Sequence, residues 1–414
     1  MTKSEQPARI AFLLDNLSGG GAEKVILNLA AGFARLGHPV DLLVCKVEGV
    51  LRNCIPAGVR LVPLKPVSAL RGTATAVRAD PGACREILGV IWNWRKLPKA
   101  FRYIPALARH LRNERTSVLI SALPKSNINA IFARRLSGGD VRVVLGAHIH
   151  LSAQESDCRS RGKSRVRTLR PLMQHCYHQA DRVVAVSRGV AGDTMAYLGL
   201  PENLVETIYN PVAGREIKGL SEEPPDHDWF EQRQVPVVLG IGRFVAQKDF
   251  PLLLRAFAEL RQRRPAHLVL LGGDASSGEQ TRHRFELQAL ADELGISEDL
   301  YMPGYKENPY PYLRRASVFV LSSRFEGFGN VLVEALFCGC PVVSTDCPSG
   351  PAEILQGGEF GHLVPVGDGQ AMTDALEAAL DAPVDSRTLR ARGEEFSVDR
   401  AVNQYHELFD RLVS

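Results

Sequence analysis

The pattern of apolar and polar positions alternates between two kinds of segment along the whole chain. Short apolar runs rich in β-branched residues, typical of buried strands, occur at 8–14, 40–45, 59–64, 117–123, 141–145, 181–186, 204–209, 235–241, 266–272, 300–304, 317–323, 341–345 and 361–368. Many are followed by apolar residues at helical spacing, most clearly at 22–36, 127–135, 250–264, 330–337, 371–380 and 397–413. Strands that alternate with helices predict an α/β fold with parallel sheets.

Two domains are expected, because 414 residues exceed the length of a single typical domain. The second half opens with a polar linker at 219–234. Between residues 66 and 98 the periodicity is poor, which predicts an insertion or a long connection.

The stretch 316–355 holds the densest set of candidate binding residues. A glycine-punctuated turn, 324–329, follows a predicted strand, and ligands of open parallel sheets bind at the carboxyl ends of strands. Gly327 and Gly329 let the backbone approach a ligand closely, and the N–H groups of the helix that follows can bind a phosphate. Glu326 and Glu334 lie eight residues apart, so each can face a hydroxyl-rich group on one side of that phosphate. A nucleotide-sugar has this arrangement, with a sugar and a ribose on either side of a diphosphate, so the stretch predicts a nucleotide-sugar site.

Three further strand ends carry candidate residues. Arg243 and Lys248 follow the strand 235–241 and can converge on one diphosphate, although an isolated pair of this kind is more often a pair of surface charges. The glycine-rich turn 15–21 lacks the G-x-G-x-x-G spacing of dinucleotide sites, and a tight βα turn with no further role is the alternative. His148 and His150 stand at the exit of the strand 141–145, where a histidine is better placed for function than most.

These motifs resemble a known family. The run from Glu326 to Glu334 (EGFGNVLVE), followed by CPVV at 340–343 and SGPAEI at 349–354, resembles the donor site of the retaining glycosyltransferases of family 4. The segment 242–248 matches the family's G-R-x₄-K donor-phosphate motif, and GGAE at 20–23 matches its N-terminal loop facing the donor phosphates and the acceptor. The family has the GT-B fold, in which two doubly wound Rossmann-like domains face a central cleft.

The resemblance implies roles for individual residues and a domain boundary. Asn-Pro-Val at 210–212 is similar to the family's hinge, so we expect an acceptor-binding domain at 1–210, a nucleotide-sugar-binding domain at 211–396, and a final helix, 397–414, packed on the first domain. The implied catalytic residues are Glu326 at the sugar hydroxyls, Arg243 and Lys248 at the diphosphate, and His148 beside the donor sugar, with His150 as its alternative. The implied donor-binding residues are Gly20, Gly21, Gly242, Gly304, Tyr305 (near the base), Gly327, Phe328, Gly329, Asn330, Val331 and Glu334 (at the ribose), with Glu23 and the turn Gly272-Gly-Asp274 as further candidates.

Composition excludes several other classes of protein. Apolar residues make up 45% and charged residues 23%, as in ordinary globular proteins, and no apolar run approaches the roughly 18 residues that a membrane span needs. The N-terminus lacks the apolar region of a signal peptide, and eight cysteines show neither disulfide nor metal spacing. We therefore expect a cytoplasmic protein. No cofactor is expected besides the nucleotide-sugar co-substrate, and no metal, because Arg243, Lys248 and helix N–H groups can stabilise the diphosphate and no Asp-x-Asp motif ends a strand.

The net charge of +4 conceals a strong asymmetry. Residues 1–200 hold 30 of the 50 Lys and Arg but 13 of the 46 Asp and Glu, a net charge of +17, which leaves −13 for the remainder. Cations cluster at 92–115, among Trp and other aromatic residues, and at 159–170. Aromatic residues interleaved with cations suit an anionic membrane surface, here the inner face of the plasma membrane, whereas a solvated helix face beside core aromatics is the alternative. The basic half could also bind a pyrophosphate-linked acceptor or nucleic acid. Of these two, we expect the acceptor and not nucleic acid.

Together these features predict a retaining hexosyltransferase. It would move a hexose or N-acetylhexosamine from a UDP-sugar to a lipid-linked, polysaccharide or lipopolysaccharide acceptor, with GDP-mannose as the alternative donor. Other GT-B enzymes, such as an epimerase or a phosphorylase, and a non-catalytic GT-B binding module are the remaining alternatives. The intact donor-site charges at Arg243, Lys248, Glu326 and Glu334 argue against the epimerase and the non-catalytic module.

Overall fold

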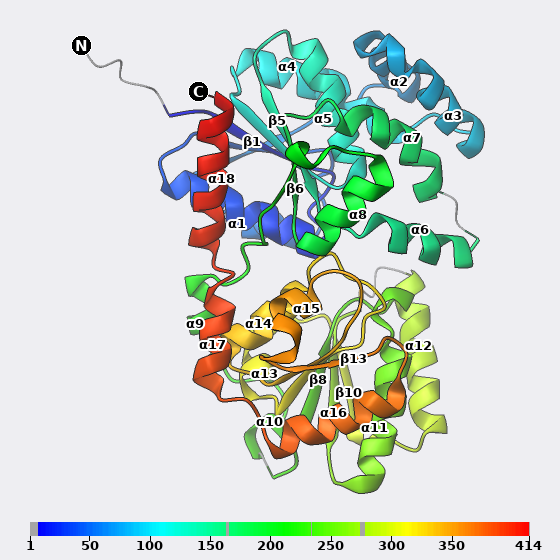
Figure 1. The fold of residues 1–414 in the computed structure, drawn as a ribbon, viewed down its shortest axis with the longest axis vertical. Helices are drawn as coiled ribbons and strands as arrows, with labels where there is room; N and C mark the ends of the chain where they lie inside the picture. The colour runs from blue at the N-terminus through cyan, green and yellow to red at the C-terminus, as the bar shows by residue number, and fades with distance from the viewer. Residues whose placement is uncertain (1–6, 163–164, 233, 274–277, 414) are drawn as a thin grey trace. The chain divides into compact units, whose positions relative to one another are not determined.

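The computed structural model describes residues 7–162, 165–232, 234–273 and 278–413 (Figure 1). The chain forms two compact units. Unit 1 comprises Met1–Pro211 and Val398–Ser414, and unit 2 comprises Val212–Ser397.

Unit 1 is built on a sheet of seven parallel strands in the order β3-β2-β1-β4-β5-β6-β7. The strands are β1 (Ile10–Leu14), β2 (Val40–Val44), β3 (Val59–Pro63), β4 (Val118–Ala122), β5 (Arg142–Ala147), β6 (Arg182–Ala185) and β7 (Val205–Thr207). The strand order reverses between β1 and β4, so this sheet has its topological switch point there.

Helices surround this sheet. The α-helices are α1 (Gly21–Arg35), α2 (Ala69–Ala79), α3 (Cys84–Trp94), α4 (Ile104–Asn113), α5 (Pro124–Ser137), α6 (Leu151–Ser160), α7 (Arg165–Tyr177), α8 (Arg188–Leu198) and α18 (Val398–Val413). Short 3₁₀ turns are η1 (Val50–Cys54), η2 (Pro81–Ala83), η3 (Lys99–Tyr103) and η4 (Glu202–Leu204).

The last helix of the chain belongs to unit 1. In Figure 1 α18 runs beside α1, and the rings of Phe33 and Phe409 stack with centroids 5.1 Å apart. Gly32 makes this contact close, because a Cβ at that position would lie 2.2 Å from the Val402 side chain. The core of unit 1 therefore joins the first helix of the chain to the last.

Unit 2 is built on six parallel strands in the order β10-β9-β8-β11-β12-β13. The strands are β8 (Val237–Ile241), β9 (His267–Leu271), β10 (Leu300–Gly304), β11 (Val318–Leu321), β12 (Val342–Thr345) and β13 (His362–Val364). Here the order reverses between β8 and β11, which pair directly. The two sheets are those of a doubly wound α/β protein, as the pattern of apolar positions predicts.

The helices of unit 2 are α9 (Arg215–Leu220), α10 (Trp229–Gln232), α11 (Phe250–Arg263), α12 (Gly278–Glu293), α13 (Tyr310–Arg315), α14 (Asn330–Cys338), α15 (Pro351–Ile354), α16 (Gly369–Asp381) and α17 (Ser386–Glu394), with 3₁₀ turns η5 (Ala246–Lys248), η6 (Ser297–Asp299) and η7 (Gln356–Gly358). The linker expected at 219–234 is thus partly helical.

The prediction for residues 66–98 was incomplete. The structure has two helices there, α2 and α3, joined by η2 at one edge of unit 1 (Figure 1). The buried face of α2 is made of small residues, Gly72, Thr73 and Ala76, so no apolar stripe marks it in the sequence. Gly72 lies so close to its neighbour that a Cβ would come within 2.6 Å of the Phe101 carbonyl oxygen.

Among the described residues, no helix is both long enough and apolar enough to span a bilayer.

Candidate functional site

The carboxyl ends of β8 and β11 are adjacent, and their loops are hydrogen-bonded to each other. The Arg324 N–H donates to the Gln247 carbonyl oxygen at 2.8 Å, and the Gln247 side-chain amide donates to the Phe325 carbonyl oxygen at 2.8 Å. The Ser322 hydroxyl donates to the Lys248 carbonyl oxygen at 2.7 Å. The loop of the Arg243–Lys248 motif and the loop of Glu326 therefore form one structural feature at the switch point of the sheet.

An ion pair lies at the centre of this feature. Lys248 Nζ is 2.6 Å from Glu326 Oε1, and the Ser323 hydroxyl donates to the same oxygen at 2.6 Å. Thr345 fixes Ser323 in turn, because its hydroxyl donates to the Ser323 carbonyl oxygen at 2.6 Å. Glu326 Oε2 makes no hydrogen bond to any residue that the structure describes. The carboxylate is thus held through one oxygen and keeps the other for a ligand.

Arg243 stands apart from this ion pair. Its side chain is exposed and makes neither a hydrogen bond nor an ion pair within the described ranges. Gly242 gives the Lys248 side chain room, since a Cβ there would lie 3.3 Å from the methylene groups of the lysine. One cation of the motif is therefore fixed and the other projects from the loop.

Two glycines shape the start of α14. Gly329, with φ 96°, occupies the N-cap position of the helix, and no side chain caps it. Gly350, also with φ 96°, lies against Phe328, because a Cβ at Gly350 would come within 1.8 Å of the Phe328 carbonyl oxygen. The beginning of α14, with Asn330 and Val331 in its first turn, forms a backbone surface suited to an anion.

Glu334, one turn into α14, is 9% exposed. Its carboxylate makes no hydrogen bond or ion pair to any described residue, and its oxygens are not among the buried atoms that lack a partner, so solvent reaches them. Burial and the charge of Glu334 together raise the pKa of the Tyr310 hydroxyl and raise that of the Cys338 thiol to about 12. The carboxylate is therefore accessible to a hydroxyl or amide donor of a ligand.

The neighbouring strand ends carry the remaining candidates of unit 2. The Gly242 N–H donates to the Leu271 carbonyl oxygen and the Gly272 N–H donates to the Gly304 carbonyl oxygen, both at 2.9 Å. Gly304 has φ 95° and precedes Tyr305, whose side chain is 46% exposed. Gly327, Phe328 and Gly329 lie in the Glu326 loop itself. Asp274 falls outside the described residues.

In unit 1, Gly20 and Gly21 lie where β1 passes into α1. Gly20 is the N-cap residue of the helix and has no side-chain cap. A Cβ at Gly20 would come within 2.4 Å of Glu23 Oε2, so the Glu23 carboxylate folds back over this turn. The Gly20 backbone and the Glu23 carboxylate therefore lie next to each other in the turn between β1 and α1.

The two histidines after β5 have different surroundings. His148 Nδ1 is buried without a hydrogen bond within the described chain, and burial lowers the pKa of His148 to about 4, so the ring is neutral near pH 7. His150 instead caps α6: its Nδ1 accepts from the Ala153 N–H at 3.4 Å and lies 3.3 Å from Asp193 Oδ1. The structure therefore assigns His150 a structural role and leaves His148 as the candidate.

Sequence reasoning did not identify Ser322, Ser323 and Thr345, which hold the two loops and Glu326 in place. One signal was present: two adjacent serines close an otherwise apolar strand. Within the described ranges, no group of three or more His, Cys, Asp or Glu side chains is placed to hold a metal ion.

Two family models match the chain on either side of the boundary between the units. Residues 19–213 match the model described as Glycosyltransferase Family 4, and residues 235–382 match the model described as Glycosyl transferases group 1. The chain belongs to the family 4 glycosyltransferases, with the two-domain GT-B fold.

Individual relatives of this family 4 chain are similar over different lengths. The N-acetylgalactosamine-N,N'-diacetylbacillosaminyl-diphospho-undecaprenol 4-alpha-N-acetylgalactosaminyltransferase of Campylobacter jejuni is 31% identical over 210 residues, 51% of this chain and 53% of that protein. The lipopolysaccharide 1,6-galactosyltransferase of Escherichia coli is 25% identical over 323 residues, 76% of this chain and 80% of that protein. The chain spans about half the length of the first of these relatives.

Solved structures share the fold across nearly the whole chain. HepE of Anabaena in complex with UDP-glucose has a TM-score of 0.75 at 18% identity, covering 97% of this chain and 99% of that one. Sucrose-phosphate synthase of Thermosynechococcus elongatus has a TM-score of 0.76 at 18% identity, covering 98% and 99%.

Proposed function

We propose that this protein is a retaining glycosyltransferase that moves a hexose or N-acetylhexosamine from a UDP-sugar to a lipid-linked or lipopolysaccharide acceptor. The observation that carries the proposal is the Lys248–Glu326 ion pair at the switch point of the unit 2 sheet, where the Glu326 loop leads into the start of α14 and the Lys248 loop also carries the exposed Arg243. Cations, a partly satisfied carboxylate and a helix N-terminus in one place are what a nucleotide-sugar requires.

The diphosphate is the leaving group and the main target of this charge. Arg243 and Lys248, with the first N–H groups of α14, supply positive charge where negative charge develops in the transition state. Lys248 has three N–H donors, and one is directed at Glu326, so two remain for phosphate oxygens.

The two glutamates take the hydroxyl groups on either side of the diphosphate. Glu326 Oε2 accepts from the donor sugar, while the carboxylate of Glu334, which makes no hydrogen bond to any described residue, accepts from the ribose. Both carboxylates of a glycoside hydrolase would have to flank a single scissile bond. Glu326 and Glu334 stand on either side of a helix start instead, which favours transfer from a nucleotide-sugar.

His148, Gly20 and Gly21 are assigned to the donor sugar and phosphates as in the family. A neutral His148 ring can donate a hydrogen bond through one nitrogen and accept through the other. Retention follows from attack on the face that the phosphate leaves, and the chain offers no residue that we assign as nucleophile. The reaction needs no metal in this scheme, because side chains and backbone neutralise the diphosphate.

The donor and acceptor are proposed from chemistry and from similarity. The E. coli relative is a lipopolysaccharide galactosyltransferase and the C. jejuni relative acts on a diphospho-undecaprenol, while the Anabaena neighbour holds UDP-glucose. These names favour a UDP-sugar and an acceptor at a membrane, to which this protein binds peripherally from the cytoplasm. GDP-mannose is the alternative donor.

A thermal-shift panel of UDP, GDP, ADP and their sugars in the presence of EDTA tests the proposal. A ligand that binds the folded state at a hundred times its Kd stabilises it by about 2.7 kcal/mol, which raises the Tm by several degrees. We expect UDP and UDP-sugars to stabilise the protein and GDP to have little effect. Stabilisation by GDP alone would show that the donor is GDP-mannose and not a UDP-sugar. If no nucleotide stabilises the protein, the proposed donor site is wrong.

A further inference from the structure

Helix α3 has an apolar inner face and a second, exposed apolar face. Ile87 and Val90 are buried in unit 1, whereas Leu88 is 58% and Trp92 83% exposed. Leu88 and Trp92 are four residues apart, so their side chains lie next to each other on the outside of the helix. Leu70, on the neighbouring helix α2, is 69% exposed. An exposed indole beside an exposed leucine is unfavourable in water and indicates a partner surface.

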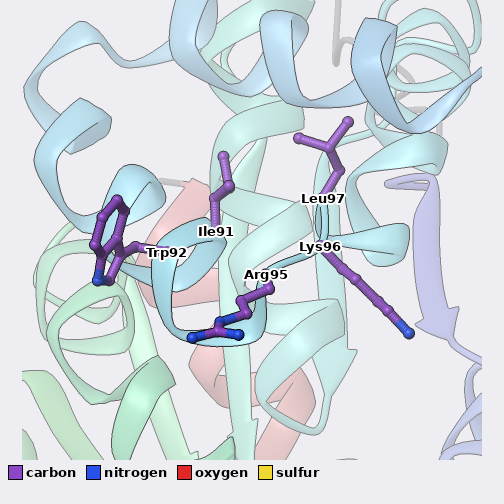
Figure 2. A pocket seen from close by; sticks show the side chains of 5 residues that line it. All are labelled: Ile91, Trp92, Arg95, Lys96 and Leu97. Carbon is purple, nitrogen blue, oxygen red and sulfur yellow. The ribbon is translucent and has the colours of Figure 1, made fainter.

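The end of α3 is also hollowed. Arg95 ends the helix in the left-handed conformation, with φ 50°, and the chain then reverses. An open hollow of about 490 Å³ lies at this turn, lined by Ile91, Trp92, Arg95, Lys96 and Leu97 (Figure 2). In Figure 2 the Arg95 side chain extends toward the Trp92 side of the turn and the Lys96 side chain extends to the opposite side, while Ile91 and Leu97 point away from both charged ends. Apolar and cationic side chains therefore border the same turn.

The exposed face of α3 and the turn that follows it carry positive charge for which the described residues provide no ion-pair partner. Arg85, Arg95, Lys96 and Lys99 are all exposed, and Arg85 lies three residues before Leu88, as Arg95 lies three residues after Trp92. Between residues 81 and 113 the sequence contains a single acid, Glu86, whose side chain is partly buried. Apolar residues on a helix face flanked by Arg and Lys are the pattern of an interfacial membrane helix.

The rest of the segment 92–115 does not combine exposed aromatic residues with cations that lack a partner. Phe101 and Tyr103 are buried in unit 1, and the Arg112 guanidinium donates to the Ser137 carbonyl oxygen at 3.0 Å. Arg102 likewise donates to the Val67 carbonyl oxygen at 2.7 Å. For these residues the alternative of core aromatics beside structural cations applies. The exposed surface is the beginning of the predicted segment, Trp92 to Lys99, together with Arg85 and Leu88 just before it.

In the second basic segment, 159–170, some of the cations also have partners within the protein. The Arg161 guanidinium pairs with Asp157, and Arg170 donates to the Tyr197 carbonyl oxygen at 3.0 Å while lying over the Tyr197 ring. Residues 163 and 164 fall outside the described residues. The strongest unpartnered surface is therefore that of α3.

We propose that the outer face of α3 docks this protein on an anionic phospholipid bilayer. Leu88 and Trp92 enter the interface, and Arg85, Arg95 and Lys96 contact lipid phosphates around them. A bilayer suits both halves of this surface, since nucleic acid would match the cations but provide no hydrocarbon for Leu88. The inference rests on the proposed function in one respect: a lipid-linked acceptor lies in such a membrane.

Vesicle co-sedimentation of the full chain tests the docking surface. We expect binding to vesicles of phosphatidylethanolamine with phosphatidylglycerol, weak binding to phosphatidylcholine, and loss of binding in high salt. Trp92→Ser, and separately Arg95→Glu with Lys96→Glu, should each weaken binding at least about tenfold, because each cation near an anionic surface contributes roughly a fivefold factor. Matched controls in unit 2, Phe285→Ser and Arg387→Glu, change an exposed aromatic and an exposed cation and should bind like the unchanged protein.

The outcomes separate this inference from the proposed function. UDP stabilisation, measured without vesicles in the same variants, should be unchanged and also shows that they are folded. If the unchanged protein fails to bind anionic vesicles, or binds phosphatidylcholine equally well, the docking surface is wrong while the UDP result still stands. Equal weakening by the Phe285 or Arg387 control would also overturn it. Vesicle binding without any UDP stabilisation would keep the docking surface and refute the donor site.

Discussion

The residues of the proposed donor site have separate roles in the proposed mechanism, which single substitutions can test. Lys248 touches Glu326 and, in the proposed mechanism, the leaving diphosphate. Lys248→Ala should lower turnover by about 10²- to 10³-fold, the usual effect of removing one preorganised group that stabilises developing charge. The protein should still fold, but its melting temperature should fall by several degrees, because the largely buried Glu326 carboxylate keeps only the Ser323 hydroxyl as a donor.

Steady-state turnover and thermal unfolding of Lys248→Ala check this prediction. Arg255→Ala, which removes an exposed cation seven residues further along the chain, is the matched control and should be near normal in both measurements. Near-normal turnover in Lys248→Ala would remove this lysine from the mechanism.

Glu334 should matter for binding and little for folding. Glu334→Gln keeps the size of a side chain that makes no hydrogen bond to any described residue and whose oxygens solvent reaches, so the stability of the ligand-free protein should change little. The same change weakens hydrogen bonds to the ribose, because a charged acceptor is lost, and should raise the Kd for UDP about tenfold. Calorimetric titration with UDP and urea unfolding measure the two effects, with Glu293→Gln on the surface of α12 as control. An unchanged Kd would show that Glu334 does not bind the nucleotide.

His148 gives the protein a predictable pH dependence. Burial lowers the pKa of His148 from 6.5 to about 4, so the folded state binds its proton less readily than the unfolded chain. The contribution of the neutral ring to stability is fully present above pH 6.5 and is lost as the pH falls toward about 4, at up to about 1.4 kcal/mol per pH unit. Urea unfolding across this range should show a weaker pH dependence in His148→Phe than in the unchanged protein. Identical pH profiles would mean that His148 is not buried as described.

At the level of elements, the contact between α1 and α18 depends on a missing side chain. Gly32→Ala places a methyl group 2.2 Å from Val402 and should lower the free energy of unfolding by about 1–3 kcal/mol, as overpacking does. Val402→Ala in the same chain should recover part of this loss. Gly192→Ala, in α8 where a Cβ meets nothing within 4 Å, should instead stabilise by up to about 1 kcal/mol. A double-mutant cycle by urea unfolding measures the coupling, and additive effects would rule out the steric explanation.

The loops at the switch point of unit 2 illustrate how elements create a site. Parallel pairing of β8 with β11 brings together two loops that are distant in sequence. The hydrogen bond between Gln247 and Phe325 joins residues 78 positions apart. The sequence predicts both motifs at strand ends, with Arg243 and Lys248 converging on one diphosphate, and the structure adds that the two strands are direct neighbours. The serines and the threonine that hold them were not predicted, since hydroxyl groups at a strand end carry no periodic signal.

For the whole molecule, the chain passes between the two units twice, at 211–212 and at 397–398. Removing residues 398–414 would uncover the part of the unit 1 core that Tyr405, Leu408 and Phe409 bury. We expect calorimetry of the truncated chain to show a weakened transition for unit 1 and a transition still raised by UDP, because the loops assigned to the nucleotide lie in unit 2. Loss of the UDP effect on truncation would show that unit 1 is required to bind the nucleotide.

The sequence by itself determined the positions of nearly all strands, the α/β class and the family, because strand periodicity and the EGFGNVLVE and G-R-x₄-K motifs are local properties of the chain. It could not predict which residues of 66–115 are exposed. Helix α2 buries small residues, α3 exposes an indole, and Phe101 and Tyr103 fill the core, and each of these facts depends on the surface that the element meets. Burial is a property of two packed surfaces, and the second surface is distant in sequence.

Contacts with residues that are distant in sequence also decide the different roles of His148 and His150, and which oxygen of Glu326 is hydrogen-bonded. His148 and His150 are equivalent in the sequence, and only the position of Asp193 on α8 gives His150 its capping role. Glu326 was recognised from its motif, but the choice of which oxygen is held depends on Lys248, Ser323 and the fold that brings them together. Local pattern identifies the chemistry of this protein, and long-range packing decides which atoms are available for it.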